Sequence, residues 1–179
     1  MELIPTSIPD IIILKPDVFG DDRGYFFESF QVEKFAAFGI TDSFIQSNES
    51  CSQKDVLRGL HYQLEPFAQG KLVRVIKGSV LDIAVDIRRN SPTFGQWVSM
   101  KLTGENKWIC FIPKGFAHGF VTLEPDTIFT YKCSGLYNKA SEGSIRWNDP
   151  ELNIDWGITS PLLSEKDKEA PLFKDARLF

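Results

Sequence analysis

The sequence predicts a mostly β fold, a jelly-roll barrel with short peripheral helices, formed by one domain over residues 1–179. Short apolar segments separated by turn residues at regular intervals are typical of β-sandwiches and barrels. The chain also contains 15 Phe and four Trp residues, and this aromatic content suits a β-rich core. A chain of this length can bury a proper core.

The first elements expected along the chain are a strand over 24–30, a helix over 32–38 and a strand over 44–50. Gly39 follows the helix directly and predicts its end, because glycine readily adopts the left-handed conformation of a C-terminal cap.

Residues 71–88 carry the clearest β pattern in the chain. From Leu81 to Ile87 every second residue is a branched aliphatic, and the residues between are Asp82, Ala84 and Asp86. A period of two predicts a half-buried strand, with one face against the core. Lys77-Gly78 separates this segment from the preceding apolar run and predicts a hairpin turn.

Four further strands are expected over 97–102, 108–112, 119–123 and 128–133, with turn residues between them. A second short helix is expected to begin at Ser164, because Asp167 three residues later resembles a capping box. The last third of the chain is rich in Pro, Asn and Asp and predicts ordered loops packed on the sheet.

Composition narrows the class of protein. The formal net charge of −4 argues against a nucleic-acid partner but leaves room for a local basic pocket. Cys51, Cys110 and Cys133 form no CxxC pair, so neither a disulfide framework nor a zinc knuckle is indicated. The N-terminus lacks a signal-like pattern, and the apolar run at 11–14 is too short to cross a bilayer. We therefore expect a cytoplasmic protein without a membrane partner.

The segment VLRGLHYQ, residues 56–63, is the first candidate for chemistry. It places Arg58 three residues before His61, and an imidazole can exchange a proton near neutral pH. In an extended strand these two side chains face opposite sides, but a turn at Gly59 would bring both into one cavity. The pair then suits proton transfer on an anionic substrate. The alternative is a core histidine with both nitrogens satisfied by hydrogen bonds.

The second of the two histidines, His118, lies in a Pro-x-Gly-x-x-His pattern that occurs in cupin barrels, where the histidine often binds a metal. The His-x-His pair that would accompany it reads His61-Tyr62-Gln63 here. A three-histidine site therefore cannot form. A site of two histidines and one carboxylate, from Glu65 or Asp82, stays open, although no metal and no cofactor are expected.

Other polar residues have ordinary interpretations when taken singly. Lys71, at the start of a strand, is either a solvated lysine or a cation that stabilises negative charge developing on an oxygen. Arg23 lies in a polar turn, Tyr131 and Tyr137 suit strand and loop positions, and Asp167 suits a helix end.

Taken together, the motifs of this chain resemble those of the dTDP-4-dehydrorhamnose 3,5-epimerase family of deoxysugar biosynthesis. Eight strings occur in the order of that family over roughly residues 3–172. They are FGDDRGYFFESF, QSNES, VLRGLHYQ, QGKLVRVIKGSVLDIAVDIRRNSPTFGQW, IPKGFAHGF, IFTYK, IRWNDP and LSEKD.

The resemblance implies a cupin-type jelly roll, a homodimer and no metal. It also implies conversion of dTDP-4-dehydro-6-deoxy-D-glucose, a dTDP-linked 4-keto-6-deoxy sugar, to dTDP-4-dehydro-L-rhamnose. His61 matches the catalytic base of the family, and Asp167 matches the acid paired with it. Tyr131 matches the proton donor, and Lys71 matches the lysine near the C4 carbonyl.

The remaining matches are to positions that contact the nucleotide or the sugar. Tyr137 matches the tyrosine that stacks on thymine. The other contact positions are Arg23, Glu28, Gln46, Ser47, Asn48, Arg58, His118, Glu142 and Lys166.

Two local departures from the family pattern are visible. Residues 133–140 read CSGLYNKA, where two adjacent tyrosines and a proline are expected, although Tyr137 itself is present. Gly157 follows Trp156 where proline is common.

Two kinds of alternative to the 3,5-epimerase function stay open. One is a sister epimerase that inverts one centre or acts on another nucleotide-linked ketosugar. The other is a metal cupin or a sugar-binding barrel without catalysis.

Overall fold

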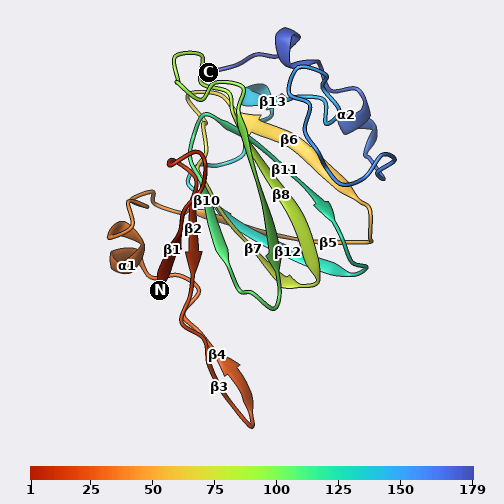
Figure 1. Ribbon diagram of the computed structural model, residues 1–179. Coiled ribbons are helices and arrows are strands. Elements are labelled where there is room, and N and C mark those ends of the chain that lie inside the picture. Colours follow the sequence, from red (N-terminus) through yellow and green to blue (C-terminus); the bar gives the residue numbers. More distant parts are fainter.

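The computed structural model describes residues 1–179 and contains two antiparallel β-sheets that face each other, with a hairpin that projects from one end (Figure 1). The first sheet has the order β1 (Glu2–Ile4), β2 (Ile12–Lys15), β10 (Ile109–Ile112), β7 (Lys71–Lys77), β12 (Thr127–Cys133) and β5 (Gln46–Ser52). The second has the order β13 (Glu142–Ser144), β6 (Leu57–Gln63), β11 (Phe116–Thr122), β8 (Ser79–Asp86) and β9 (Trp97–Thr103). The projecting hairpin consists of β3 (Phe19–Asp21) and β4 (Gly24–Phe26).

From β5 onward the chain repeatedly crosses between the two sheets, which is the connectivity of the predicted jelly roll. Apolar side chains from both sheets fill the space between them, including Val73, Leu102, Phe116 and Phe129. The central core therefore lies inside the barrel.

Each sheet is also covered on its outer face. Helix α1 (Val32–Ala36) places the fully buried Phe35 against Leu72 and Phe111 of the first sheet. The C-terminal segment packs Trp156 and Phe173, among others, on the outer face of the second sheet. This segment contains the 3₁₀ helices Lys139–Ser141 and Phe173–Asp175 and helix α2 (Glu165–Lys168), and it confirms the predicted ordered loops.

The predicted hairpin at Lys77-Gly78 is wrong. Strand β7 pairs with β10 and β12, whereas β8 pairs with β9 and β11 in the other sheet. Gly78 forms a corner between the sheets with φ of +79°, and a side chain there would lie 2.3 Å from Thr127 Oγ1. The alternating pattern marks strands on both sides of the turn, but it does not identify the partner of each strand.

The prediction of a half-buried β8 is also wrong, because both of its faces are buried. Ile83 and Val85 contact the C-terminal segment, while Ala84 joins the core inside the barrel. Asp82 also has an exposed fraction of 0%. The polar positions of the pattern therefore face the interior rather than the solvent.

The two predicted helices are present. Helix α1 ends at Ala36, two residues earlier than expected, and Gly39 adopts φ of +88° after it. Helix α2 begins after Ser164, whose side chain accepts a hydrogen bond from the backbone N–H of Asp167, as the capping box predicts. Neither α-helix approaches the length of a membrane-spanning helix.

The observed strands differ from the expected ones in number and length. The strand expected over 24–30 stops at Phe26, because Phe27 and Phe30 leave the hairpin and pack against the cluster around α1. The sequence predicts no strand at the positions of β1, β2, β3, β6 and β13.

Candidate active site

The two histidines of the chain lie side by side. Strands β6 and β11 pair antiparallel, and their register places His61 directly opposite His118. His61 is half-buried, whereas His118 is buried inside the barrel. Two residues 57 positions apart in the sequence therefore share one site.

Gly59 makes the backbone irregularity that brings Arg58 and His61 together. It adopts φ of +137°, and a Cβ there would lie 2.5 Å from the Cα of Gly119. The register between β6 and β11 shifts at this point, between His118 and Phe120. Because the alternation of side chains is interrupted, Arg58 and His61 line the same cavity. The sequence suggested a turn at Gly59 for this purpose, but strand β6 continues through Gly59 and an irregularity in its pairing has the same effect.

Two adjoining cavities of about 280 and 240 Å³ form one cleft that is lined by strands of both sheets. His61, Lys71 and Tyr131 line both cavities. The larger one is completed by residues that include Gln46, Asn48, Tyr137 and Glu142, and the smaller by residues that include Arg58, His118 and Asp167. The structure thus gathers most of the residues that the sequence singled out.

His61 and Asp167 form a short polar contact in the cleft. Nε2 of His61 lies 2.5 Å from Oδ1 of Asp167, and the Asp167 side chain is 4% exposed. Ser164 Oγ donates to the other carboxylate oxygen at 2.9 Å. Burial alone raises the pKa of Asp167, but the hydrogen bond and charge of His61, together with the Ser164 hydroxyl, lower it overall. The carboxylate is therefore suited to hold the ring in one tautomer and to stabilise its protonated form.

Lys71 and Tyr131 come from the first sheet and lie across the barrel from His61. Lys71 Nζ is 3.4 Å from the backbone oxygen of His61, and burial lowers the pKa of this lysine. Burial also raises the pKa of Tyr131, so its hydroxyl keeps its proton at neutral pH. The cleft thus holds a base, a cation and a protonated hydroxyl on opposing walls.

The ring of His118 is held by a hydrogen bond to a carboxylate inside the barrel. Its Nε2 lies 2.9 Å from Oδ2 of Asp82, and burial lowers the pKa of His118 despite the opposing effect of Asp82. The two carboxylates next to the histidines, Asp82 and Asp167, therefore bond to different rings. No three His, Cys, Asp or Glu side chains gather as a metal site would require, and Glu65 lies exposed in the turn after β6.

Tyr137 lies at the mouth of the larger cavity, with an exposed fraction of 56%. Its hydroxyl donates to Glu142 at 3.2 Å, and its backbone N–H donates to Gln46 Oε1 at 3.3 Å. Lys166 forms an ion pair with Glu142, although Lys166 itself does not line the cavity. An aromatic ring fixed at the entrance can stack on a planar ligand group.

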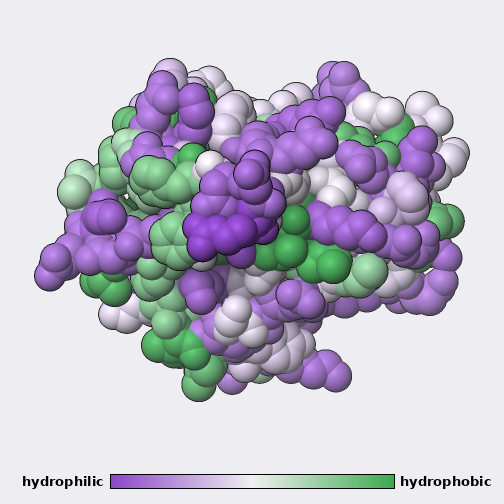
Figure 2. Space-filling model, turned by 90° about the horizontal axis from the view of Figure 1, so that it is seen from below, coloured by the Kyte–Doolittle hydropathy of each residue, from purple (hydrophilic) through white to green (hydrophobic).

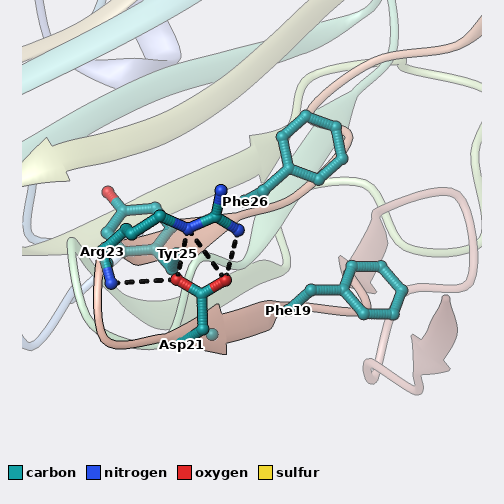
Figure 3. Close-up of a pocket in the computed structure, with 7 residues that line it drawn as sticks. Phe19, Asp21, Arg23, Tyr25 and Phe26 are labelled. Carbon is teal, nitrogen blue, oxygen red and sulfur yellow. Dashed lines mark hydrogen bonds and ion pairs between the residues drawn. The ribbon is translucent and has the colours of Figure 1, made fainter.

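Three predicted contact residues lie away from the cleft of their own chain. Ser47 points to the opposite face of β5 from Gln46 and Asn48 and is exposed. Arg23 lies on the projecting hairpin, where it pairs with Asp21 beside Phe19 and Phe26 (Figure 3). Glu28 follows this hairpin and pairs with Lys34.

The sequence assigned no site role to several residues that the structure places in the cleft. Gln63, Gln69 and Cys133 line the larger cavity, and Ser164 lines the smaller one. Gln63 had a usable signal, because it lies two positions after His61 and a strand turns both side chains to the same side. The other three depend on contacts between distant segments.

Comparison with known proteins agrees with the family resemblance of the sequence motifs. A model of the dTDP-4-dehydrorhamnose 3,5-epimerase family matches residues 5–175. A dTDP-4-dehydrorhamnose 3,5-epimerase from Shigella flexneri is 53% identical over 180 residues, covering 100% of this chain and 99% of its own.

Solved structures agree over nearly the whole fold. A dTDP-6-deoxy-D-glucose-3,5-epimerase from Legionella pneumophila, solved with dTDP-4-keto-L-rhamnose, is 52% identical with a TM-score of 0.93, and the match covers 97% of this chain and 93% of the other. A 3'-monoepimerase from Streptomyces bikiniensis, solved with dTDP-quinovose, is 35% identical with a TM-score of 0.89, covering 95% and 87%. The cupin-type jelly roll, the motif order and these matches over the full length show that the chain belongs to the dTDP-4-dehydrorhamnose 3,5-epimerase family.

Proposed function

We propose that this chain converts dTDP-4-dehydro-6-deoxy-D-glucose to dTDP-4-dehydro-L-rhamnose in dTDP-L-rhamnose biosynthesis, without a metal or cofactor. The observation that carries the proposal is the His61–Asp167 pair, which faces Tyr131 across a cleft that also contains Lys71. This arrangement supplies a base and an acid on opposite walls, as inversion of a C–H centre requires.

The reaction follows from the acidity of the sugar. The C4 ketone acidifies the C–H bonds at C3 and C5, since loss of either proton gives an enolate. His61 accepts the proton through the ring nitrogen that is not bonded to Asp167, and Asp167 stabilises the resulting imidazolium. Lys71 balances the negative charge on the enolate oxygen, an effect of about 3–4 kcal/mol for a preorganised donor.

Inversion needs the proton to return from the other face of the ring. Tyr131 belongs to β12 of the first sheet and His61 to β6 of the second, so the two side chains approach the cleft from opposing sheets. Tyr131 donates its hydroxyl proton to the carbanion carbon of the enolate and is itself reprotonated from solvent. Each positioned acid or base contributes about 10²–10⁴-fold to the rate.

The nucleotide binds through the other residues of the cleft. Arg58 is exposed at the edge of the smaller cavity, where its guanidinium can bind the diphosphate in bidentate fashion. Gln46 and Asn48 offer amide groups along the larger cavity, and Tyr137 stacks on the thymine. His118, Glu142 and Lys166 complete the binding set around the sugar and the base.

A homodimer accounts for Arg23 and Glu28. The hairpin extends well away from the barrel (Figure 1), and Phe19, Tyr25 and Phe26 on it are 66%, 59% and 69% exposed. Figure 2, viewed from the end that carries the hairpin, shows hydrophobic surface beside strongly hydrophilic groups. We infer that each chain inserts this hairpin against its partner, so that Arg23, Glu28 and Ser47 act at the boundary between two chains. Such an isologous arrangement is the commonest form of a homo-oligomer.

The reaction is tested by proton NMR of dTDP-4-dehydro-6-deoxyglucose in deuterated buffer with the metal-stripped protein. Loss of both the H3 and H5 signals is the expected result. Loss of only one would support a single-centre epimerase such as the Streptomyces bikiniensis relative. Binding of the substrate without any exchange would favour a sugar-binding barrel, and activity that returns only with added metal would favour a metal cupin.

The dimer is tested by mixing two inactive variants, Arg23→Ala and His61→Asn. In a mixed dimer, one site combines the intact His61 of the first variant with the intact hairpin of the second. Recovery of activity on mixing is therefore expected, and no recovery in a confirmed mixed dimer would refute the shared site.

All three cysteines are free thiols, and together with the nucleotide-linked substrate this supports our placement of the enzyme in the cytoplasm.

A further inference from the structure

Gln63 is a buried amide in the wall of the cleft whose polar atoms are all directed at neighbouring loops. It ends strand β6, lies on the same side of the strand as His61 and is 6% exposed. Its Nε2 donates to the backbone oxygens of Phe67 at 3.0 Å and Leu136 at 3.1 Å. Its Oε1 accepts a hydrogen bond from the backbone N–H of Asn138 at 2.7 Å.

Two of these hydrogen bonds hold both peptide groups of Tyr137. The oxygen of Leu136 belongs to the peptide group that precedes Tyr137, and the N–H of Asn138 belongs to the one that follows it. A single side chain thereby fixes the backbone on either side of the tyrosine. Gln46 and Glu142 add one hydrogen bond each, to the N–H and the hydroxyl of Tyr137.

The loop needs this support because it has little apolar anchoring. Leu136 and Tyr137 are 58% and 56% exposed, and Gly135 before them has no side chain. Local structure with few buried contacts has low intrinsic stability, so its hydrogen bonds determine its conformation. The amide supplies donor and acceptor together, whereas a carboxylate cannot donate and an aliphatic chain offers neither.

We propose that Gln63 is a positioning residue that sets the orientation of Tyr137 and thereby the affinity of the enzyme for the nucleotide base. The inference rests on the proposed function, in which Tyr137 stacks on that base. Gln63 does not touch the reacting carbons in this scheme. Its loss should weaken nucleotide binding while leaving proton transfer by His61 and Tyr131 intact.

The test replaces Gln63 by methionine, which keeps the length of the side chain and removes its three hydrogen bonds. We expect the KM for the dTDP-sugar and the Kd for dTDP, measured by calorimetry, to rise about tenfold, the equivalent of one or two hydrogen bonds. We expect kcat to change by less than about twofold, because uniform binding affects KM alone. Gln53→Met is the matched control, since Gln53 bonds Asp126 on an exposed loop and should leave both constants unchanged.

A double-mutant cycle with Tyr137→Ala shows whether Gln63 acts through the tyrosine. The double variant should bind dTDP no more weakly than Tyr137→Ala alone, because the effect of Gln63 is lost once the ring is absent. Hydrogen exchange of the Asn138 amide should also become faster in Gln63→Met, since its acceptor is gone. Additive losses in the cycle, or a fall in kcat at constant KM, would overturn the proposal.

Gln63→Glu covers the case in which the methionine variant does not fold. Glutamate keeps an acceptor for Asn138 and loses the donors to Phe67 and Leu136, so the same rise in KM is expected. If both variants fail to fold, Gln63 is a structural residue and the proposal is wrong. If the unmodified enzyme binds dTDP but exchanges no sugar proton, the proposed reaction fails while the dTDP measurements still test Gln63.

Discussion

Replacement of Asp167 by asparagine tests the catalytic pair most directly. The side chain keeps its shape, but the amide cannot offer a negative charge to His61 Nε2 at 2.5 Å. Ser164 still has an oxygen to which it can donate, so the packing of α2 should survive. The substitution therefore removes the charge with little change to the fold.

The size of the effect follows from the geometry. When His61 takes a proton from the sugar, the new positive charge lies roughly 4 Å from the centre of the carboxylate, which stabilises it by about 4 kcal/mol at an effective dielectric constant of 20. The His61 side chain is 30% exposed, so solvent screens part of this attraction. A loss of about 2–4 kcal/mol corresponds to a fall of roughly 30- to 1000-fold in kcat.

The assay is solvent deuterium incorporation at C3 and C5 under saturating substrate, with thermal unfolding as the control for folding. Both centres should slow together, because one base serves both, and the Kd for dTDP should stay the same. A variant that retains the unmodified rate, or that slows at only one carbon, would refute the assignment of His61 and Asp167 as the common base.

The other predictions concern the proton donor, the helix cap and acid stability. Tyr131→Phe should still release protons to solvent but should form product at least tenfold more slowly, as seen by comparing washout with product formation; equal losses would contradict a donor role. Ser164→Ala should lower kcat about threefold to tenfold and shift the pH profile, while Ser164→Thr should restore both, since threonine keeps the hydroxyl that bonds Asp167. Burial raises the pKa of Asp86, but hydrogen bonds from Arg88, Ser91 and Thr93 outweigh it and lower that pKa to about 2. Its stabilisation is therefore complete above its ordinary value of 3.8 and lost as pH falls toward about 2. Acid titration of unfolding should show that loss in the unmodified chain and much less of it in Asp86→Asn.

The sequence by itself determined the local features of this protein. Alternation over 81–87 predicted a strand, Gly39 predicted the end of α1, and Ser164 with Asp167 predicted the start of α2, because each signal depends on residues a few positions apart. The order of its motifs also placed the chain in its family, which the comparisons confirmed.

Only the tertiary structure decided which segments meet. Asp167 reaches His61 across 106 residues, and the sheet change at Gly78 turned a predicted hairpin into a corner. Asp82 looked solvent-facing from its alternation, yet it lies inside the barrel beside His118. Gln63 gains its importance from a loop more than 70 residues away. Periodicity reports which side chains share a face, but the partner of that face depends on packing between distant segments, and no local pattern contains that information.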